Sequence, residues 1–415
     1  MISPHPTYTP RGTPISVLNR CRALSGLGAE VDLVTYGIGT DVAVPGLRWL
    51  RAPVPGVRTV KVGPSPAKLP LDLAVFLRAA WQVLRRRRRY DALHTHEEAG
   101  LLGALLSRLT GLPHVYDMGN DMSVVARNYG FGRFHPVTVL AELAERITVR
   151  GSTSVIAHFP SVADRARRAS HGRVPATVVL NVSLDAPVDP DITARARAVW
   201  APQGEQIVLY AGTLEAYQGV PLLVEAMTQV RDLPVRLVIV GGRDDQQRLL
   251  EKLAAGLGVA DRVVVAGASA QQDVPSLYRA ADVLASPRES GDNTPLKLFS
   301  YLGSGRPVLA TRIASHTQIV DDTTAELVDP TPAALAAGVR RLLGSPERRG
   351  ELARNGIRAC DEHFGMRAYV AGVAAAYARA GLPDEGGADP DAAARAVAEQ
   401  LTAASGTRPS PAVGT

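Results

Sequence analysis

The sequence predicts an α/β protein built from two doubly wound, Rossmann-like domains. Short β-branched runs alternate with helical patterns along most of the chain, as in parallel sheets covered by helices. The runs are almost continuously apolar, which indicates strands that are buried on both faces. A chain of 415 residues is longer than one hydrophobic core usually organises, so about two domains are expected.

The apolar runs place the strands of each domain. In the first half they lie at residues 30–36, 47–52, 91–95, 113–118 and 153–159. In the second half they lie at residues 206–212, 235–241, 262–267, 281–286, 307–311 and 325–329. The segment between them is rich in Pro and Asp, so we expect domains at 1–183 and 206–364 with a linker at 184–205.

The two ends of the chain differ from this regular pattern. A complete doubly wound domain should open with a full strand, whereas this chain begins "MISPHP". Either the first strand is very short or the true start lies upstream of Met1. At the other end, residues 383–415 are rich in Gly, Ala, Pro and Asp, and we expect them to be disordered.

Composition narrows the class of protein. With 46% hydrophobic and 21% charged residues, the chain has the balance of a soluble globular protein, and its net charge of +6 suits anionic ligands. Cys21 and Cys360 form neither a disulfide framework nor a metal-ligand spacing, as expected for core residues in a reducing cytoplasm. Asp72 and Arg78 interrupt the longest apolar region, so no membrane span is predicted. Aromatic residues make up only 5%, which argues against nucleic-acid binding.

Ligands of doubly wound domains bind beyond the carboxyl ends of the strands. Gly212 follows the strand 206–212, and Gly219 opens the next helix. Gly241 ends the strand 235–241 and suggests a tight turn or a close backbone approach. The alternative at each position is an ordinary strand-to-helix turn.

The stretch "PRESGDNTPLKLF", residues 287–299, is the most informative of these ends. Asn293 or Thr294 is expected to cap a helix whose first residue is Pro295. Glu289, which we expect to be buried, can accept hydrogen bonds from hydroxyl groups, and the free amides of the turn suit a phosphate. Together they suit a phosphorylated sugar. The alternative is a polar turn followed by a solvated lysine, Lys297.

Polar residues also follow strands of the first half. His94 and His96 share one face of a strand, and no clear further metal ligand follows them. Glu97 and Glu98 are expected in the first turn of a helix, where acids complement its dipole. Asp117, Asn120 and Asp121 form a polar cluster at the end of the strand 113–118, and Gly12 and Thr13 precede another helix.

Residues 68–89 predict an amphipathic helix. One apolar stripe is expected to pack on the sheet, and it consists of Leu69, Leu73, Phe76, Leu77, Ala80, Trp81 and Leu84. Arg85–Arg89 end this helix. They form either a solvated helix end or a contact with an anionic membrane surface.

Over residues 1–382 the chain resembles the family 4 glycosyltransferases of the GT-B fold. The resemblance is carried by "RGTPISVLNRCRALSGLGAEVDLVTY", "DALHTHEEAG", "AGTLEAYQGVPLLVEAM", "VRLVIVGG", "VPSLYRAADVLASPRESG" and "LFSYLGSGRPVLAT". It implies two domains facing a cleft, the first on the acceptor side and the second binding a nucleotide sugar. It also implies a segment at 365–382 that crosses back to the first domain. The implied reaction is a retaining sugar transfer without a metal or a separate cofactor.

The resemblance also implies roles for particular residues. Glu289 matches the first Glu of the family's Glu-x7-Glu motif, which contacts hydroxyls of the donor sugar. The loop facing the pyrophosphate is matched by Ser290, Gly291, Asp292, Asn293 and Thr294, and the Gly-rich loop of the first domain by Gly12 and Thr13.

Several family positions differ in this chain. The second Glu of the motif is Lys297, the Lys before the helix glycine is Gln218, and the Arg after the strand glycine is Thr213. The His usually found after the strand 113–118 is Gly119. Because both cations expected near the pyrophosphate are missing, we expect Lys297 to replace them, with Arg288 as a second candidate.

These observations define the predicted site. We expect Glu289, Asp117 and Asp121 to take part in catalysis. The donor is expected to contact Gly12, Thr13, Gly212, Thr213, Gln218, Gly241, Arg288, Ser290, Gly291, Asp292, Asn293, Thr294 and Lys297. The acceptor is a small molecule, a glycan or a lipid-linked sugar, and the protein is expected in the cytoplasm or at the inner membrane face. The alternatives are a catalytically silent sugar-nucleotide binder and a GT-B sugar-nucleotide epimerase.

Overall fold

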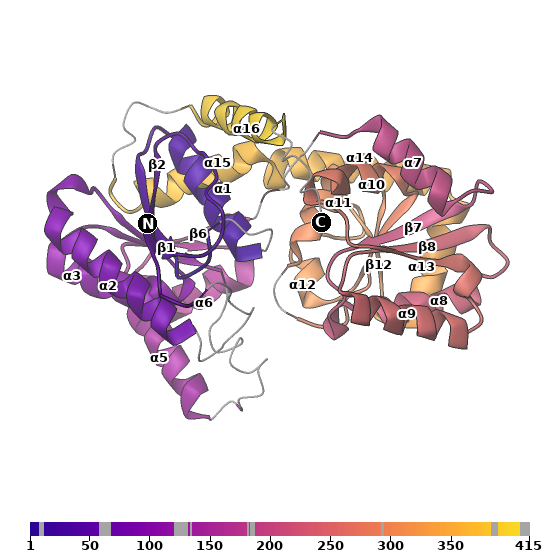
Figure 1. Ribbon diagram of the computed structural model, residues 1–415, viewed down its shortest axis with the longest axis horizontal. Coiled ribbons are helices and arrows are strands. Elements are labelled where there is room, and N and C mark those ends of the chain that lie inside the picture. The colour runs from indigo at the N-terminus through magenta and orange to yellow at the C-terminus, as the bar shows by residue number, and fades with distance from the viewer. Residues whose placement is uncertain are drawn as a thin grey trace. The chain divides into compact units, whose positions relative to one another are not determined.

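The computed structural model describes residues 1–7, 12–57, 68–119, 132, 135–180, 182, 187–291, 294–382 and 389–406. The chain divides into two compact units, whose elements are labelled in Figure 1. The first unit consists of Met1–Asn181 and Met366–Gln400, and the second is built on Val182–Gly365. The segment Met366–Gln400 therefore returns to the unit that holds the N-terminus.

The first unit contains a parallel sheet with a very short first strand. Its strands are β1 (Val31–Tyr36), β2 (Leu47–Ala52), β3 (Leu93–His96), β4 (His114–Met118), β5 (Ser154–Ala157) and β6 (Ala176–Val178). Ile2 forms parallel bridges with Val34 of β1 and Thr95 of β3, so it stands between these two strands. The order is therefore β2-β1-Ile2-β3-β4-β5-β6. The opening "MISPHP" thus supplies a very short strand at Ile2.

Several helices accompany this sheet. They are α1 (Gly12–Gly26), α2 (Leu69–Arg86), α3 (Gly100–Thr110), α5 (Pro136–Arg150), α6 (Pro160–Ser170), α15 (Met366–Ala378) and the first part of α16 (Pro390–Gly406). The helix α15 contacts α1, β5 and β6. It is joined to the sheet by Arg379, whose guanidinium donates to the Thr177 hydroxyl at 2.7 Å.

The helix α2 presents the opposite apolar stripe to the one predicted. Leu71, Val75, Ala79 and Val83 are buried against the sheet. Most of the predicted stripe instead faces outward: Phe76 and Ala80 are partly buried and pack against the same core, but the other five members are exposed, namely Leu69, Leu73, Leu77, Trp81 and Leu84. Both stripes are apolar, and the sequence periodicity alone did not decide which of them the sheet covers.

The predicted disorder of residues 383–415 is wrong for residues 390–406, which form α16. Ala393 and Val397 of α16 are buried. A Cβ atom at Gly26 would lie 2.9 Å from the carbonyl oxygen of Ala393, so α16 runs close against the end of α1. Residues 383–388 and 407–415 lie outside the described part of the chain.

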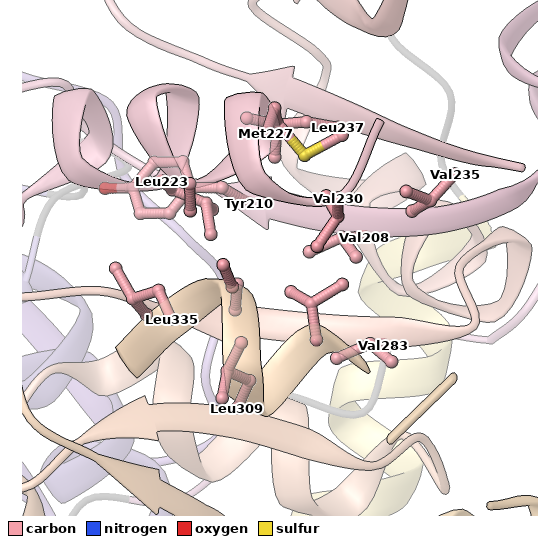
Figure 2. Close-up of a cluster of buried hydrophobic side chains, with 14 of the residues drawn as sticks. Val208, Tyr210, Leu223, Met227, Val230, Val235, Leu237, Val283, Leu309 and Leu335 are labelled. Atoms are coloured by element: carbon pink, nitrogen blue, oxygen red, sulfur yellow. The ribbon is translucent and has the colours of Figure 1, made fainter. Parts of the chain in front are cut away.

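The second unit is a six-stranded parallel sheet. Its strands are β7 (Gln206–Ala211), β8 (Val235–Val240), β9 (Val263–Gly267), β10 (Val283–Ser286), β11 (Val308–Thr311) and β12 (Glu326–Val328). The order β12-β11-β10-β7-β8-β9 reverses between β7 and β10, which is the topological switch point of a doubly wound sheet. Figure 2 shows part of its core, where Tyr210 of β7 lies near Leu223 of the following helix and Val208 lies near Val230.

Helices cover both faces of this second sheet. They are α7 (Pro190–Trp200), α8 (Val220–Ala226), α9 (Asp244–Gly256), α10 (Val274–Ala280), α11 (Leu296–Gly303), α12 (Ala314–Thr317), α13 (Pro332–Gly344) and α14 (Pro346–Ala359). The helix α7 lies in the segment predicted as a linker. The Asp189 side chain caps it, and α7 packs on α10.

Both cysteines lie in the core. Cys21 and Cys360 are buried thiols outside any disulfide, as expected of core residues. Within the described ranges, every helix is too short or too polar to cross a bilayer.

Candidate functional site

The loops that follow β7 and β10 meet at the switch point of the second unit. The Glu289 backbone N–H donates to the Tyr217 carbonyl oxygen at 3.0 Å. Gly219 has a φ of +67°, and a Cβ atom there would lie 2.1 Å from the Pro287 carbonyl oxygen. Glycine is therefore required at this position on two grounds, its left-handed backbone and the close approach of the second loop.

The neighbouring strand ends also approach closely. Gly241, after β8, has a φ of +115°, and a Cβ atom there would lie 2.2 Å from the Gly212 carbonyl oxygen. Its N–H donates to the Gly267 carbonyl oxygen at 2.7 Å. Of the two readings of Gly241, the close backbone approach is the one observed.

Lys297 lies inside this loop cluster, in the first turn of α11. The helix begins at Leu296 with Pro295 as its N-cap and no side-chain cap, one residue later than predicted. The Lys297 Nζ atom donates to Gln218 Oε1 at 3.1 Å and lies 3.8 Å from the centroid of the Tyr210 ring. A lysine that points to solvent is therefore contradicted. Lys297 thus reaches Gln218, the residue that the resemblance described above matches to a lysine of the family.

The charge of Lys297 has no acidic partner in the described ranges, where its ammonium contacts only the Gln218 side chain and the Tyr210 ring. Burial, and secondly the charge of Arg288, lower the pKa of Lys297 well below its usual range. The Arg288 guanidinium lies 4.9 Å from the centroid of the Tyr217 ring, and the residue is only 9% exposed. Two cationic side chains thus converge where an anion would relieve their repulsion.

Groups that can bind hydroxyls flank these cations. Glu289 is exposed, so the expectation that it is buried is wrong. Thr294 is 4% exposed, and its Oγ1 atom has no hydrogen-bond partner among the described residues. Thr213 and Ser290 are exposed, whereas Gln218 is buried. Asp292 and Asn293 of the predicted site fall outside the described residues.

In the first unit, Asp117 is the centre of a buried ion cluster. It is 1% exposed, and its carboxylate accepts from Arg20 Nε at 2.8 Å and from His158 Nε2 at 2.6 Å. His94 Nε2 lies 3.3 Å from the same carboxylate, and His94 Nδ1 lies 2.8 Å from the Tyr377 hydroxyl of α15. Asp117 is therefore enclosed by partners, whereas Asn120 and Asp121 lie outside the described residues.

The electrostatics of this cluster follow from burial and charge pairing. Burial alone would raise the pKa of Asp117, but the charges of Arg20 and His158 outweigh it and hold that pKa well below its usual range. Burial lowers the pKa of His96 to about 4. His96 is consequently neutral at physiological pH.

A second group of side chains lies at the switch point of the first unit. Glu97 and Glu98 lie in the first turn of a short 3-10 helix, Glu97–Ala99, that leads into α3, as predicted. The Glu97 carboxylate also lies 3.4 Å from His5 Nε2 and 3.8 Å from His96 Nδ1. The sequence analysis missed His5, because nothing local links it to Glu97. His5 and Glu97 are thus ligand-type neighbours of His96 in space. Gly12 and Thr13 form the start of α1.

Comparisons with known proteins agree with this architecture. The family model "Glycosyl transferase 4-like domain" matches residues 11–182, and "Glycosyl transferases group 1" matches residues 205–345. The D-inositol 3-phosphate glycosyltransferase of Xylanimonas cellulosilytica is 31% identical over 390 residues, covering 89% of this chain and 92% of the relative. The alpha-D-kanosaminyltransferase of Streptomyces kanamyceticus is 27% identical over 330 residues, covering 72% of this chain and 81% of the relative.

Solved structures share the fold at lower identity. Sucrose-phosphate synthase from Thermosynechococcus elongatus superimposes with a TM-score of 0.70 at 22% identity, covering 91% of this chain and 95% of that chain. The Anabaena protein Alr3699/HepE in complex with UDP-glucose gives a TM-score of 0.67 at 16% identity, covering 91% of this chain and 98% of that chain. With its two doubly wound units, the chain belongs to the group 1 glycosyltransferases and has their GT-B fold.

Proposed function

We propose that this glycosyltransferase moves a sugar from a nucleotide-sugar donor, bound at the switch point of the second unit, to an acceptor hydroxyl with retention of configuration. The observation that carries the proposal is Lys297, whose amino group contacts Gln218 and the Tyr210 ring, interacts with the charge of Arg288 and has no acidic partner among the described residues. A half-buried ammonium without an acidic partner is costly, and a bound anion would offset that cost.

The donor uses these groups as follows. Its diphosphate lies against Lys297 and Arg288, with the free amides at the start of α11 adding a partial positive charge. Because these cations stabilise the charge that develops on the departing diphosphate, the donor site needs no divalent ion. Glu289 accepts hydrogen bonds from the hydroxyls of the sugar. Thr294 Oγ1, which is buried and has no hydrogen-bond partner in the described part of the chain, donates a further hydrogen bond.

The comparisons support the substrate class. Relatives are named as glycosyltransferases that act on D-inositol 3-phosphate, and one solved neighbour contains UDP-glucose. These names favour a small hydroxylated acceptor and a nucleoside diphosphate leaving group. Retention is supported by the resemblance of Glu289 and its loop to the retaining family members. The change from Glu to Lys at residue 297 is a feature of this chain's own donor site.

A turnover screen tests the proposal. The purified protein is incubated with UDP-, GDP-, TDP- and ADP-sugars, with and without inositol phosphates and aminocyclitols, and nucleoside diphosphate release is measured. We expect release from one donor class that depends on an acceptor, with a retained anomeric configuration by NMR. Binding without release would indicate the silent binder, and conversion of the donor without any acceptor would indicate the epimerase.

We also propose that an exposed apolar face of the first unit contacts an anionic membrane surface. On α2 the exposed apolar side chains run into Arg85–Arg89, and the Arg85 guanidinium lies 5.5 Å from the centroid of the Trp81 ring. The helix α3 contacts both α2 and α5, and both α3 and α5 expose further apolar side chains. These residues are Leu101, Leu105, Leu109, Val137, Val139, Leu140, Leu143 and Ile147. An apolar face bordered by arginines suits the headgroup region of anionic lipids.

A further inference from the structure

Three side chains meet at the topological switch point of the first unit. Ile2 and β3 are neighbouring parallel strands, since the Ile2 N–H donates to the His94 carbonyl oxygen at 2.8 Å and the His96 N–H donates to the Ile2 carbonyl oxygen at 3.0 Å. His5 follows the first of these strands, His96 ends the second, and Glu97 comes directly after it. Doubly wound sheets bind their ligands at this position.

The distances between the three side chains are those of a metal site. The Glu97 Oε2 atom lies 3.4 Å from His5 Nε2 and 3.8 Å from His96 Nδ1. One ligand atom from each of the three residues lies within 4.8 Å of the others. Zinc bonds of about 2.0–2.1 Å in a tetrahedron hold neighbouring ligand atoms roughly 3.3 Å apart. The two distances from Glu97 are therefore within about 0.5 Å of this spacing, and the two imidazoles, at most 4.8 Å apart, would have to move closer to bind the same ion.

His96 gives independent evidence for a missing ligand. It is 1% exposed, and neither ring nitrogen has a hydrogen-bond partner among the described residues. A buried imidazole without partners is costly, and a metal bond at Nδ1 would remove part of this cost. His5 is already oriented for the same purpose, because its Nδ1 atom lies 3.2 Å from the Ser3 hydroxyl and its Nε2 atom faces Glu97.

The backbone holds the carboxylate in place. Glu97 has a φ of +45°, which is unusual for any residue other than glycine. Gly119 lies next to this carboxylate, and a Cβ atom there would be only 2.7 Å from Glu97 Oε1. A glycine at residue 119 therefore avoids a steric clash with the Glu97 side chain. Strained backbone of this kind is found most often at ligand sites.

From this geometry we propose that His5, His96 and Glu97 bind a divalent transition-metal ion, with zinc the best match to two imidazoles and one carboxylate. Three protein ligands leave a fourth position open to water or to an oxygen atom of a substrate. The site is separate from the donor site of the second unit, and it does not depend on the donor proposed there.

A neighbouring set of ligand-type residues is less suitable. His96, Asp117 and His158 also bring one ligand atom each within 4.8 Å. However, the Asp117 carboxylate is already bound by Arg20 and His158, and its charge is balanced by Arg20. An ion in this second set would have to displace those contacts.

Metal binding can be measured without any activity assay. The untagged, full-length protein is stripped with a chelator and titrated with zinc in competition with a chromophoric chelator. We expect one zinc ion per chain, and a cobalt-loaded sample with the intense visible bands of a tetrahedral site. His5→Gln, His96→Gln and Glu97→Gln should each weaken zinc binding by about tenfold or more.

The controls separate this site from its alternatives. His363→Gln removes a histidine whose side chain is 66% exposed, and it should leave zinc affinity unchanged. If His96→Gln fails to fold by circular dichroism, His5→Gln, which removes a partly exposed residue, decides the result. Equal zinc affinity in His5→Gln, Glu97→Gln and His363→Gln would overturn the proposal. So would a loss of affinity confined to His158→Gln, which would assign the ion to the second set.

Discussion

At the scale of single residues, Glu289 combines exposure with a fixed backbone. Its N–H is held by the Tyr217 carbonyl oxygen, while its side chain is free to meet a ligand. We expect Glu289→Ala to lower turnover by about 100-fold, because the hydrogen bonds from the donor-sugar hydroxyls to Glu289 stabilise the transition state by a few kcal/mol. Thermal unfolding should be unchanged, since the carboxylate supports no contact within the described structure. Turnover like that of the wild type in Glu289→Ala would remove this assignment.

Lys297 makes donor binding dependent on pH. In the free protein, burial and then the charge of Arg288 lower the pKa of Lys297, so part of the population is neutral as the pH rises. A diphosphate binds the protonated form, which raises that pKa in the complex. Affinity for nucleoside diphosphate should therefore be constant below the lowered pKa and fall by about tenfold per pH unit above it.

Calorimetry in buffers of different ionisation enthalpy checks the proton uptake on the alkaline side of this transition. Lys297→Met should bind more weakly and should lose the proton uptake, because no titrating ammonium remains. An identical number of protons taken up by the wild type and Lys297→Met would show that another group titrates.

At the scale of elements, the turn after β8 is fixed by the approach of two backbones. Gly241 and Gly267 both have positive φ angles, but a Cβ atom at Gly241 would meet the Gly212 carbonyl oxygen at 2.2 Å, whereas Gly267 faces open space. We expect Gly267→Ala to cost about 1–2 kcal/mol of unfolding free energy from backbone strain alone. Gly241→Ala should cost at least about 2 kcal/mol more and should also weaken nucleotide binding. Equal losses in urea unfolding would mean that the close approach does not matter.

The strand β2 and the helix α2 show what could and could not be predicted from the sequence. The strand β2 was predicted with its observed bounds, because Gly46 and Pro53 on either side of the run "LRWLRA" are local turn signals. The amphipathic helix was also predicted correctly, but its buried face was not. Leu71 and Val75 form one apolar stripe and Leu73 and Leu77 another, and only the position of the sheet decides between them.

The exposed stripe and the arginines beside it can be tested with vesicles. Neutralising Arg87 and Arg88 together, each to Gln, should weaken binding to vesicles containing anionic lipid by roughly 1 kcal/mol per charge at low salt. The matched control removes two exposed arginines of the second unit, Arg312→Gln and Arg340→Gln, and should leave vesicle binding unchanged. Sedimentation of the wild type that is equal with anionic and zwitterionic vesicles would instead support a solvated helix end for Arg85–Arg89.

At the scale of the whole molecule, both units follow the rule that a doubly wound sheet binds ligands where its strand order reverses. In each sheet the strand order reverses once, and the side chains of the proposed site lie beside the two strands at that reversal. Glu289 and Lys297 follow β10 in the second unit, whereas His96 ends β3 and Glu97 follows it in the first. Fold class and most strands were predictable, because apolar runs and turn residues are local features.

What was not predictable depends on contacts between distant segments. Lys297 could be placed in a first helical turn, but its contact with Gln218 requires the pairing of β7 with β10. His5 and Glu97 meet only because Ile2 pairs with β3. Residues 390–406 have a composition typical of disorder, yet they form a helix because α1 offers a surface for Ala393 and Val397.

The central claim is that Lys297 takes the place of the family's missing cations and binds the donor diphosphate. It is tested most directly by calorimetric titration of the preferred nucleoside diphosphate into the wild type, Lys297→Met and Lys297→Glu at one pH. Lys297→Glu restores the residue of the family motif but adds an anion beside the phosphates, so it should lose about 2–4 kcal/mol of binding free energy. Lys297→Met should lose less, because it only removes the cation. Equal affinities in all three proteins, or tighter binding by Lys297→Glu, would contradict the claim.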